Sequence, residues 1–169
     1  MVYDDESLGG NADAPDEFYY NNEFNLYELK AVPFSFILDN NIFEDYIMNN
    51  LSFPLMSSRL KSIFDKFKKT APPFKWLNVG IQSKNNKYTF EYFLMAFSEK
   101  PDVLDLAKTR MIENDYIYGV FSYPKIKEYA FFPQPRDFDG TLVISEELKN
   151  EITKNHISGV SFLKADITF

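Results

Sequence analysis

The hydrophobic and polar positions of the chain repeat one pattern twice. Residues 53–56 form an apolar run that ends at Ser57, and residues 142–144 form another that ends at Ser145. After each serine, leucine follows three residues on and lysine four residues on, which is typical of the first turn of an amphipathic helix. Serine before a helix caps a free backbone N–H, so the pattern predicts a helix after each serine, the first over residues 58–68.

The second predicted helix places Leu148 and Ile152 on its inward face, and Gly159 marks its exit. Apolar, strand-like stretches follow the two helices, at residues 74–81 and 159–167. The pattern therefore indicates two similar strand–Ser–helix–strand units. We interpret these units as structural, because neither contains residues that suggest catalysis or ligand binding.

The rest of the chain mixes strand-like and helix-like patterns. A turn at residues 83–86 separates strand-like residues 74–81 and 88–97, which predicts a β-hairpin. The other predicted elements are a short helix over residues 41–50, a helix that begins at Pro101, and strands within residues 18–32, 115–122 and 127–132. Strands and helices do not alternate regularly, so we expect an α+β fold: a single domain with a mixed or antiparallel sheet and several short helices.

Composition indicates a folded chain. Hydrophobic residues make up 45% and aromatic residues 18% of the 169 positions, which fits one domain with a substantial core. We expect Phe74, Trp76 and the aromatic residues within 90–97 to fill that core. Cysteine is absent, which excludes disulfides and thiolate metal sites.

The acidity of the chain lies in one segment. Residues 1–30 carry eight acidic residues against Lys30 alone, which accounts for the whole net charge of −7. Phosphate contacts need clustered cations, so we expect no direct binding of nucleic acid. We predict that residues 1–16 are an acidic flexible lead and that residues 17–169 are a single α+β domain.

The beginning of the sequence lacks the basic start and the apolar stretch of a signal peptide. Uncharged stretches elsewhere are far too short to span a bilayer. These features favour a cytoplasmic protein with no membrane partner.

One short motif suggests catalysis. Asp137 and Asp139, with Gly140 and Thr141, match the Asp-x-Asp-Gly-Thr signature of haloacid-dehalogenase-type phosphatases, in which the first aspartate is the nucleophile and the second a general acid/base. That nucleophile must end a buried parallel strand, but prolines precede the motif here and too little chain follows it for such a domain. A turn into the second unit is the preferred interpretation, and a phosphatase that uses Asp137 and Asp139 is the remote alternative.

The other polar candidates have structural interpretations. His156, the only histidine, lies near the end of the second predicted helix, where we expect a cap or surface role. Asp102 with Asp105, and Glu146 with Glu147, fall in predicted first turns, where acids suit the helix dipole. The sequence therefore predicts no catalytic residue, no metal ligand and no bound cofactor.

The acidic lead and the two tyrosines after it are the candidate contact surface. Tyrosine beside carboxylates suits an interface with a basic partner, although an edge strand with solvated acids explains the same residues equally well. The candidate contact residues are Asp4, Asp5, Glu6, Asp13, Asp16, Glu17, Tyr19 and Tyr20.

Three segments, taken in order, resemble a known family. They are residues 53–61, residues 88–94 with 103–105, and residues 142–149 with 158–162. Across residues 40–169 this order and spacing resemble an immunity protein family of bacterial polymorphic-toxin systems, formerly a domain of unknown function.

The resemblance implies a protein that binds a cognate toxin in the producing cell during competition between bacteria. It implies neutralisation by stoichiometric protein–protein inhibition and carries over no catalytic residue. Toxins with a basic, nucleic-acid-acting site would attract the N-terminal acids over long range. A structural or regulatory interaction module without a toxin partner is the alternative.

Overall fold

The computed structural model describes residues 2–3, 36–38, 43–47, 54–83, 89–98, 101–112, 115–134 and 141–169. Within them, β5 (Phe74–Ser83) and β6 (Thr89–Phe97) are the longest strands and form an antiparallel hairpin. The predicted hairpin is confirmed, although most of its turn lies outside the described residues. Apolar residues occupy both faces of these strands, which is expected of the central strands of a sheet.

The hairpin is the centre of a six-stranded sheet with the order β1–β2–β5–β6–β4–β3. The outer strands are β1 (Val2–Tyr3), β2 (Phe36–Leu38), β3 (Tyr46–Ile47) and β4 (Leu55–Met56). β2 runs parallel to β5, and the other described pairings in this sheet are antiparallel. The predicted mixed sheet and α+β class are therefore confirmed.

Two helices begin where the sequence predicts them. Ser57 caps α2 (Ser58–Lys66) and Ser145 caps α4 (Glu146–Lys154), and each serine Oγ accepts the backbone N–H three residues on at 3.2 Å. A side-chain cap of this kind stabilises a helix by about 1 kcal/mol. The two capping serines are confirmed. The first helix ends at Lys66, two residues before its predicted end, and the short 3-10 helix η2 (Lys68–Thr70) follows.

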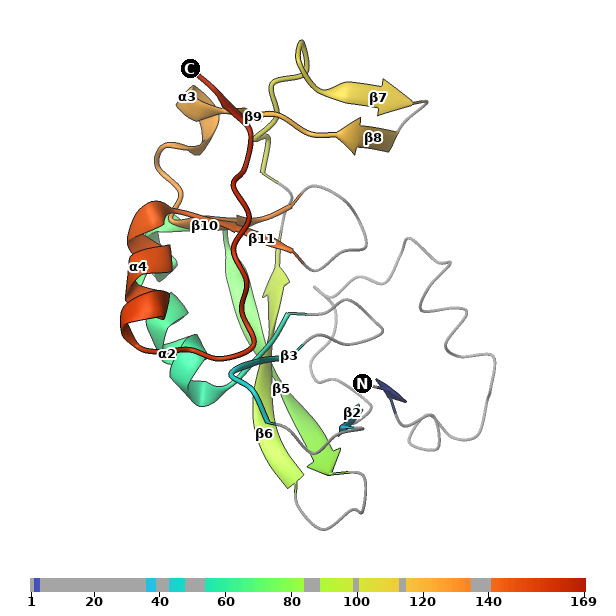
Figure 1. Cartoon of the computed structure of the whole chain (residues 1–169), viewed down its shortest axis with the longest axis vertical. Helices are drawn as coiled ribbons and strands as arrows, with labels where there is room; N and C mark the ends of the chain where they lie inside the picture. Colours follow the sequence, from blue (N-terminus) through green and yellow to red (C-terminus); the bar gives the residue numbers. More distant parts are fainter. Residues whose placement is uncertain are drawn as a thin grey trace.

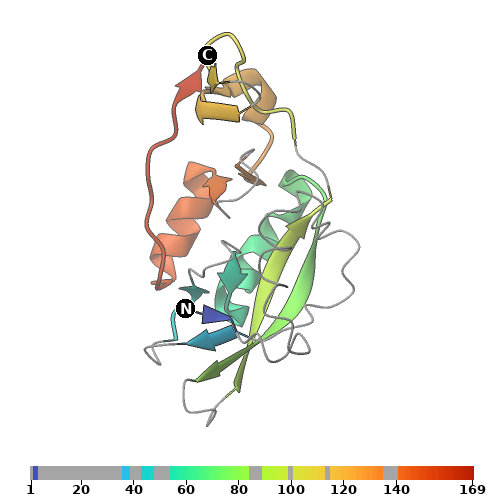
Figure 2. The ribbon, with the colours of Figure 1, turned by 90° about the vertical axis from the view of Figure 1, so that its right-hand side faces the viewer.

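The two helices lie on the same side of the β5–β6 hairpin (Figures 1 and 2). A hydrophobic core fills the space between them and the sheet. Its buried members from the helices and the sheet include Leu60, Ile63, Phe64, Phe74, Met95, Phe97, Leu148 and Ile152. The opposite face of the hairpin is also buried, as Leu77, Val79 and Ile81 show.

The aromatic residues of the hairpin only partly follow the prediction. Phe74 and Phe97 are buried in the core, and Trp76 packs against it from a half-buried position. Phe90 is 38% exposed, so its predicted place in the core is wrong. Phe90 lies near the end of the hairpin, and its ring contacts the tilted ring of Phe43 instead, at 3.8 Å between centroids.

A smaller group of elements lies at one end of the molecule, at the top of Figure 1. It contains β7 (Arg110–Ile112), β8 (Asp115–Tyr118), β9 (Phe121–Ser122), α3 (Tyr123–Ile126) and β12 (Ile167–Thr168). The antiparallel pair β10 (Phe131–Pro133) and β11 (Leu142–Ile144) joins this end to the main core. A second hydrophobic cluster supports it and consists of Val103, Leu104, Phe121, Ile126 and Phe132.

The helix predicted over residues 41–50 is wrong for the residues that are described there. Tyr46–Ile47 form β3, which pairs with β4. The Tyr46 N–H donates to the carbonyl of Ser158 at 3.1 Å, a partner from the far end of the sequence. Long-range pairing overrides the local helical pattern here.

The helix predicted from Pro101 is also wrong. Leu104 instead forms a bridge with Phe121, and the Asp105 carboxylate accepts the Ala107 N–H at 3.1 Å, so the chain makes one turn and does not continue as a helix. Leu106, which would lie on the apolar face of such a helix with Val103, is 67% exposed. Aspartate that bonds to its own following backbone competes with helix formation in this way.

Three predicted strands are shorter than expected. Residues 159–167 run without strand pairing until β12, residues 127–132 form a strand only from Phe131, and residues 115–122 divide into β8 and β9. The strand predictions within residues 18–32 lie outside the described residues. So do the acidic lead beyond β1 and the Asp-Gly-Thr turn up to residue 140.

Candidate functional site

The predicted contact residues lie outside the part of the chain that the structure describes. They are Asp4, Asp5, Glu6, Asp13, Asp16, Glu17, Tyr19 and Tyr20, and Asp137 and Asp139 of the phosphatase-like motif lie outside it too. The described residues do, however, contain three polar clusters. The sequence does not indicate that the members of any of these clusters lie together. In the structure each cluster has a structural role.

The most buried of the clusters centres on Asp45, whose exposed fraction is 6%. Its Oδ1 accepts the Ser57 hydroxyl at 2.6 Å, and its Oδ2 accepts an Arg59 N–H at 3.0 Å and the Ser158 N–H at 3.1 Å. We call Asp45, Ser57, Arg59 and Ser158 the Asp45 cluster. It joins the start of α2 to the chain that leaves α4.

Arg59 extends this connection to the second helix. Its other guanidinium nitrogen donates to the carbonyl of Asn155 at 2.9 Å, at the end of α4. An arginine there satisfies a free carbonyl and suits the negative end of the helix dipole. The two Ser-capped units are therefore linked through one carboxylate and one arginine.

Asp45→Ala should lower the free energy of unfolding by about 2 kcal/mol, because the Ser57 hydroxyl and the Ser158 N–H each lose a buried acceptor. Chemical denaturation of the wild type and the variant measures the difference. Glu128→Ala, which removes an exposed carboxylate, is the control and should change stability by about 0.5 kcal/mol or less. Equal losses in the two variants would contradict the structural role of the Asp45 cluster.

Tyr92 adds a further buried hydrogen bond at the same place. Its hydroxyl donates to the carbonyl of Glu44 at 2.6 Å. Burial, together with the charges of Asp45 and Glu44, raises the pKa of Tyr92 to about 12. The phenol therefore stays protonated and keeps donating throughout the physiological range.

Tyr92→Phe should cost about 1 kcal/mol at neutral pH, since the Glu44 carbonyl loses its donor. Because the folded pKa is raised, this contribution is fully present below the ordinary tyrosine pKa of about 10 and is lost as pH rises towards about 12. Unfolding temperatures of the two proteins between pH 8 and pH 12 should converge at the alkaline end. A constant difference over that range would contradict the buried-phenol account.

A second cluster, formed by Lys61 and Asp65 of α2 and Trp76 of β5, lies between the helix and the sheet. The Asp65 carboxylate accepts hydrogen bonds from Lys61 Nζ at 2.7 Å and from Trp76 Nε1 at 2.8 Å. Lys61 also lies over the rings of Trp76 and Phe93, at 5.4 Å and 5.3 Å from their centroids. Burial alone would raise the pKa of Asp65, but the hydrogen bonds from Lys61 and Trp76 and the nearby cations lower it overall. The cluster fixes α2 on the sheet.

The third cluster contains the aspartates that were predicted to share a helix turn. Asp105 Oδ2 accepts the Thr168 hydroxyl at 2.7 Å, and this bond chiefly lowers the pKa of the Asp105 carboxyl. Asp102 instead pairs with Lys125 at 2.8 Å. The prediction of a shared helical first turn is wrong, but both residues have the expected structural role, because they hold separate segments together.

Glu146, Glu147 and His156 lie where the sequence places them. Both glutamates are in the first turn of α4. His156 is exposed just beyond the end of α4 and has a positive φ of 51°. Among the described residues, no three His, Cys, Asp or Glu side chains gather as a metal site would require.

No described helix has the length and apolar character needed to cross a membrane. Comparison with curated proteins finds no match to the chain. Comparison with protein families matches residues 33–167, well over half of the sequence, to the immunity protein family Imm11. The match includes the two Ser-capped helices and the hairpin between them, and it spans all three segments on which the sequence resemblance rests. The chain therefore belongs to the immunity protein family Imm11.

Proposed function

We propose that the protein binds and neutralises a cognate bacterial toxin by stoichiometric protein–protein inhibition in the cytoplasm of the producing cell. The family match over residues 33–167 is the observation that supports this function. Immunity proteins are generally not enzymes. Accordingly, we propose a mechanism in which this chain occupies a surface of the toxin and catalyses no reaction.

The way in which the described residues are connected suits inhibition by binding. The Asp45 cluster, the Asp65 contacts and the hydrophobic core join segments that are far apart in the sequence, such as Asp45 and Ser158, which are 113 positions apart. A surface held by such connections loses little conformational entropy when a partner binds, which favours affinity. The scaffold is therefore suited to present a preformed surface.

Co-expression with the product of an adjacent gene tests the proposed function. Cells that make the neighbouring protein should grow only when this chain is also present, and the two proteins should co-purify. The double variant Asp137→Asn with Asp139→Asn should protect equally well, because the motif is proposed to be a turn. Protection that disappears in this variant, while the protein remains folded, would favour the phosphatase alternative.

We further propose that the acidic residues near the beginning of the chain attract a basic surface of the toxin. Changing Asp4, Asp5 and Glu6 to neutral amides should slow association about tenfold at low salt and much less at high salt, because long-range attraction is screened by ions. The matched control changes Glu128, Glu146 and Glu147, which are exposed acids elsewhere. Stopped-flow association rates that fall equally in both variants, or in neither, would contradict steering by these residues.

A further inference from the structure

Exposed apolar side chains gather on the face formed by α3 and β12. Tyr123 is 44% exposed, Ile167 40% and Phe169 95%. β12 pairs in parallel with β9 so that Ile167 lies opposite Phe121 and Thr168 opposite Ser122. This register brings Phe169 level with Tyr123, and their rings lie 5.0 Å apart. We call Tyr123, Ile167 and Phe169 the aromatic face.

The aromatic face is fixed to the fold at several points. The Phe121 N–H donates to the carbonyl of Asp166 at 2.8 Å, and the Thr168 hydroxyl donates to the Asp105 carboxylate at 2.7 Å. Phe121 itself belongs to the smaller hydrophobic cluster. The exposed side chains are therefore presented by a strand that is held to β9 and to Asp105 by hydrogen bonds.

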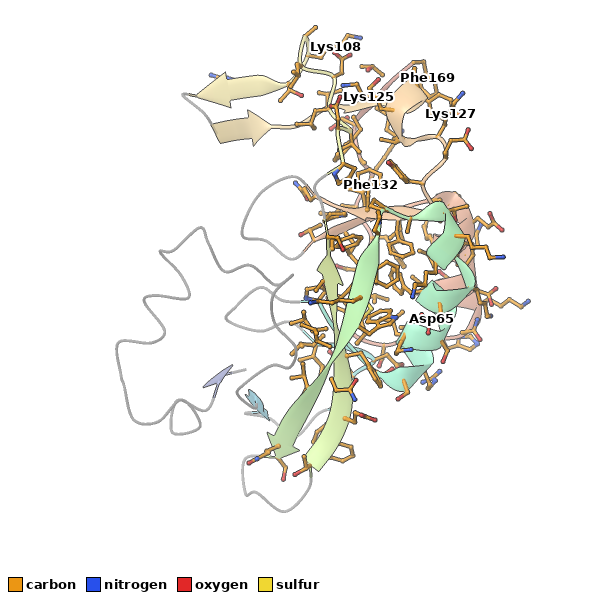
Figure 3. All side chains as sticks on the ribbon, turned by 180° about the vertical axis from the view of Figure 1, so that it is seen from behind. Asp65, Lys108, Lys125, Lys127, Phe132 and Phe169 are labelled. Carbon is orange, nitrogen blue, oxygen red and sulfur yellow. The ribbon has the colours of Figure 1, made fainter. Side chains whose placement is uncertain are left out.

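Lysines border this face. Lys127 donates its backbone N–H to the carbonyl of Tyr123, and Lys108 donates its own to the carbonyl of Asp105. Lys125 lies on the same short helix and bonds to Asp102 and to the carbonyl of Leu104. Figure 3 shows Lys108, Lys125, Lys127 and Phe169 at the same end of the molecule, far from Asp65. Within the part of the chain that is described, Lys108 and Lys127 form no ion pair.

An exposed aromatic centre with a charged border is the usual composition of a protein-binding surface. Apolar patches mark interaction sites, aromatic residues supply most of their binding energy, and the surrounding charges select the partner. Among the described strands, β12 pairs with β9 alone, and strands at the edge of a sheet are common sites of protein binding. These features together favour a protein over a small molecule.

We propose that the aromatic face is a docking surface for the cognate toxin, which would present an apolar patch bordered by carboxylates. This inference rests on the proposed function. Exposed acids also lie beside these residues, since Glu128 follows Lys127 and Asp166 precedes Ile167. Lys108 and Lys127 are nevertheless opposite in charge to the N-terminal acids, so the two groups of residues would contact different parts of the toxin. The aromatic anchors should govern dissociation, whereas the N-terminal acids should govern association.

Binding kinetics of the full chain with the purified toxin test the proposal. Tyr123→Ala combined with Phe169→Ala should weaken binding about 30-fold, mainly through faster dissociation, as expected for paired anchors. Lys108→Glu combined with Lys127→Glu should weaken it about tenfold, because the reversed charges repel the carboxylates of the partner. All four substitutions are at exposed positions, so unfolding temperatures should change little.

Two matched controls separate this face from general effects. Phe162→Ala with Leu163→Ala removes exposed apolar residues from the same C-terminal segment, and Lys69→Glu with Lys154→Glu reverses exposed charges near the helices. Both controls should bind within about twofold of the wild type, as neutral surface changes do. If the wild type binds and the aromatic-face variants bind equally well, the docking proposal is overturned and the proposed function stands. A wild type that does not bind overturns both.

Anionic vesicles provide a further arm of the experiment. We expect the Tyr123→Ala and Phe169→Ala substitutions to leave the binding of the protein to phosphatidylglycerol vesicles unchanged. If these residues are needed for vesicle binding and make no difference to toxin binding, the face is a lipid-binding surface and the proposal is wrong.

Discussion

Phe131→Ala should lower the free energy of unfolding by about 4 kcal/mol, because it removes a large side chain from the centre of the core. Phe131 is fully buried, and its ring lies 4.8 Å from that of Phe64 and 5.4 Å from that of Phe74. It also contacts Phe97, at 6.2 Å between centroids. The residue thus joins β10 to α2 and to both central strands, and its loss leaves a cavity that these elements cannot all close.

Urea denaturation of the wild type and the variant measures this effect. Phe162→Ala is the matched control, because Phe162 is 39% exposed and outside both buried clusters, and it should change stability by about 0.5 kcal/mol or less. If Phe131→Ala costs no more than this control, the proposed convergence of β10, α2 and the sheet at Phe131 is wrong.

Gly159→Ala should cost about 3 kcal/mol, because two unfavourable effects coincide there. Gly159 has a φ of +76°, a conformation that residues with a side chain rarely adopt. A Cβ at this position would clash with the carbonyl oxygen of Tyr46, which is backbone and part of β3. The substitution would therefore force β3 away from the chain that leaves α4.

His156→Gly provides a control of opposite sign on the same segment. His156 is exposed and adopts a φ of +51° without a glycine to favour it. Glycine is preferred at this position beyond a helix end, so the variant should gain about 0.5 kcal/mol. Thermal unfolding of the two variants should thus move in opposite directions. If Gly159→Ala leaves the unfolding temperature unchanged, the close approach of Gly159 to Tyr46 is wrong.

The elements that could be predicted from sequence are those specified by neighbouring residues. Ser57 and Ser145 identify both helix starts, since a cap and the apolar positions that follow it lie within one turn. The β5–β6 hairpin is similarly local, with two long apolar runs around a short polar stretch. The family resemblance likewise rests on short local segments, residues 53–61, 88–94 with 103–105, and 142–149 with 158–162.

The missed elements depend on partners far away in the sequence. The pattern around Tyr46 and Ile47 fits a helix, but β3 forms because β4 and Ser158 supply its hydrogen bonds. The Asp45 cluster has no sequence signature, since Asp45 and Ser158 are brought together only by the fold. The aromatic face is equally non-local, because it depends on the parallel pairing of β12 with β9.

Titration of the toxin with this chain tests the central claim most directly. The toxin encoded beside the gene is assayed at fixed concentration while the protein is added in increasing amounts. Inhibition by binding predicts that activity falls linearly and reaches its minimum at a fixed molar ratio, and that the complex can be isolated at that ratio. Inactivation by amounts well below that ratio, or full activity at excess protein, would contradict a stoichiometric immunity protein.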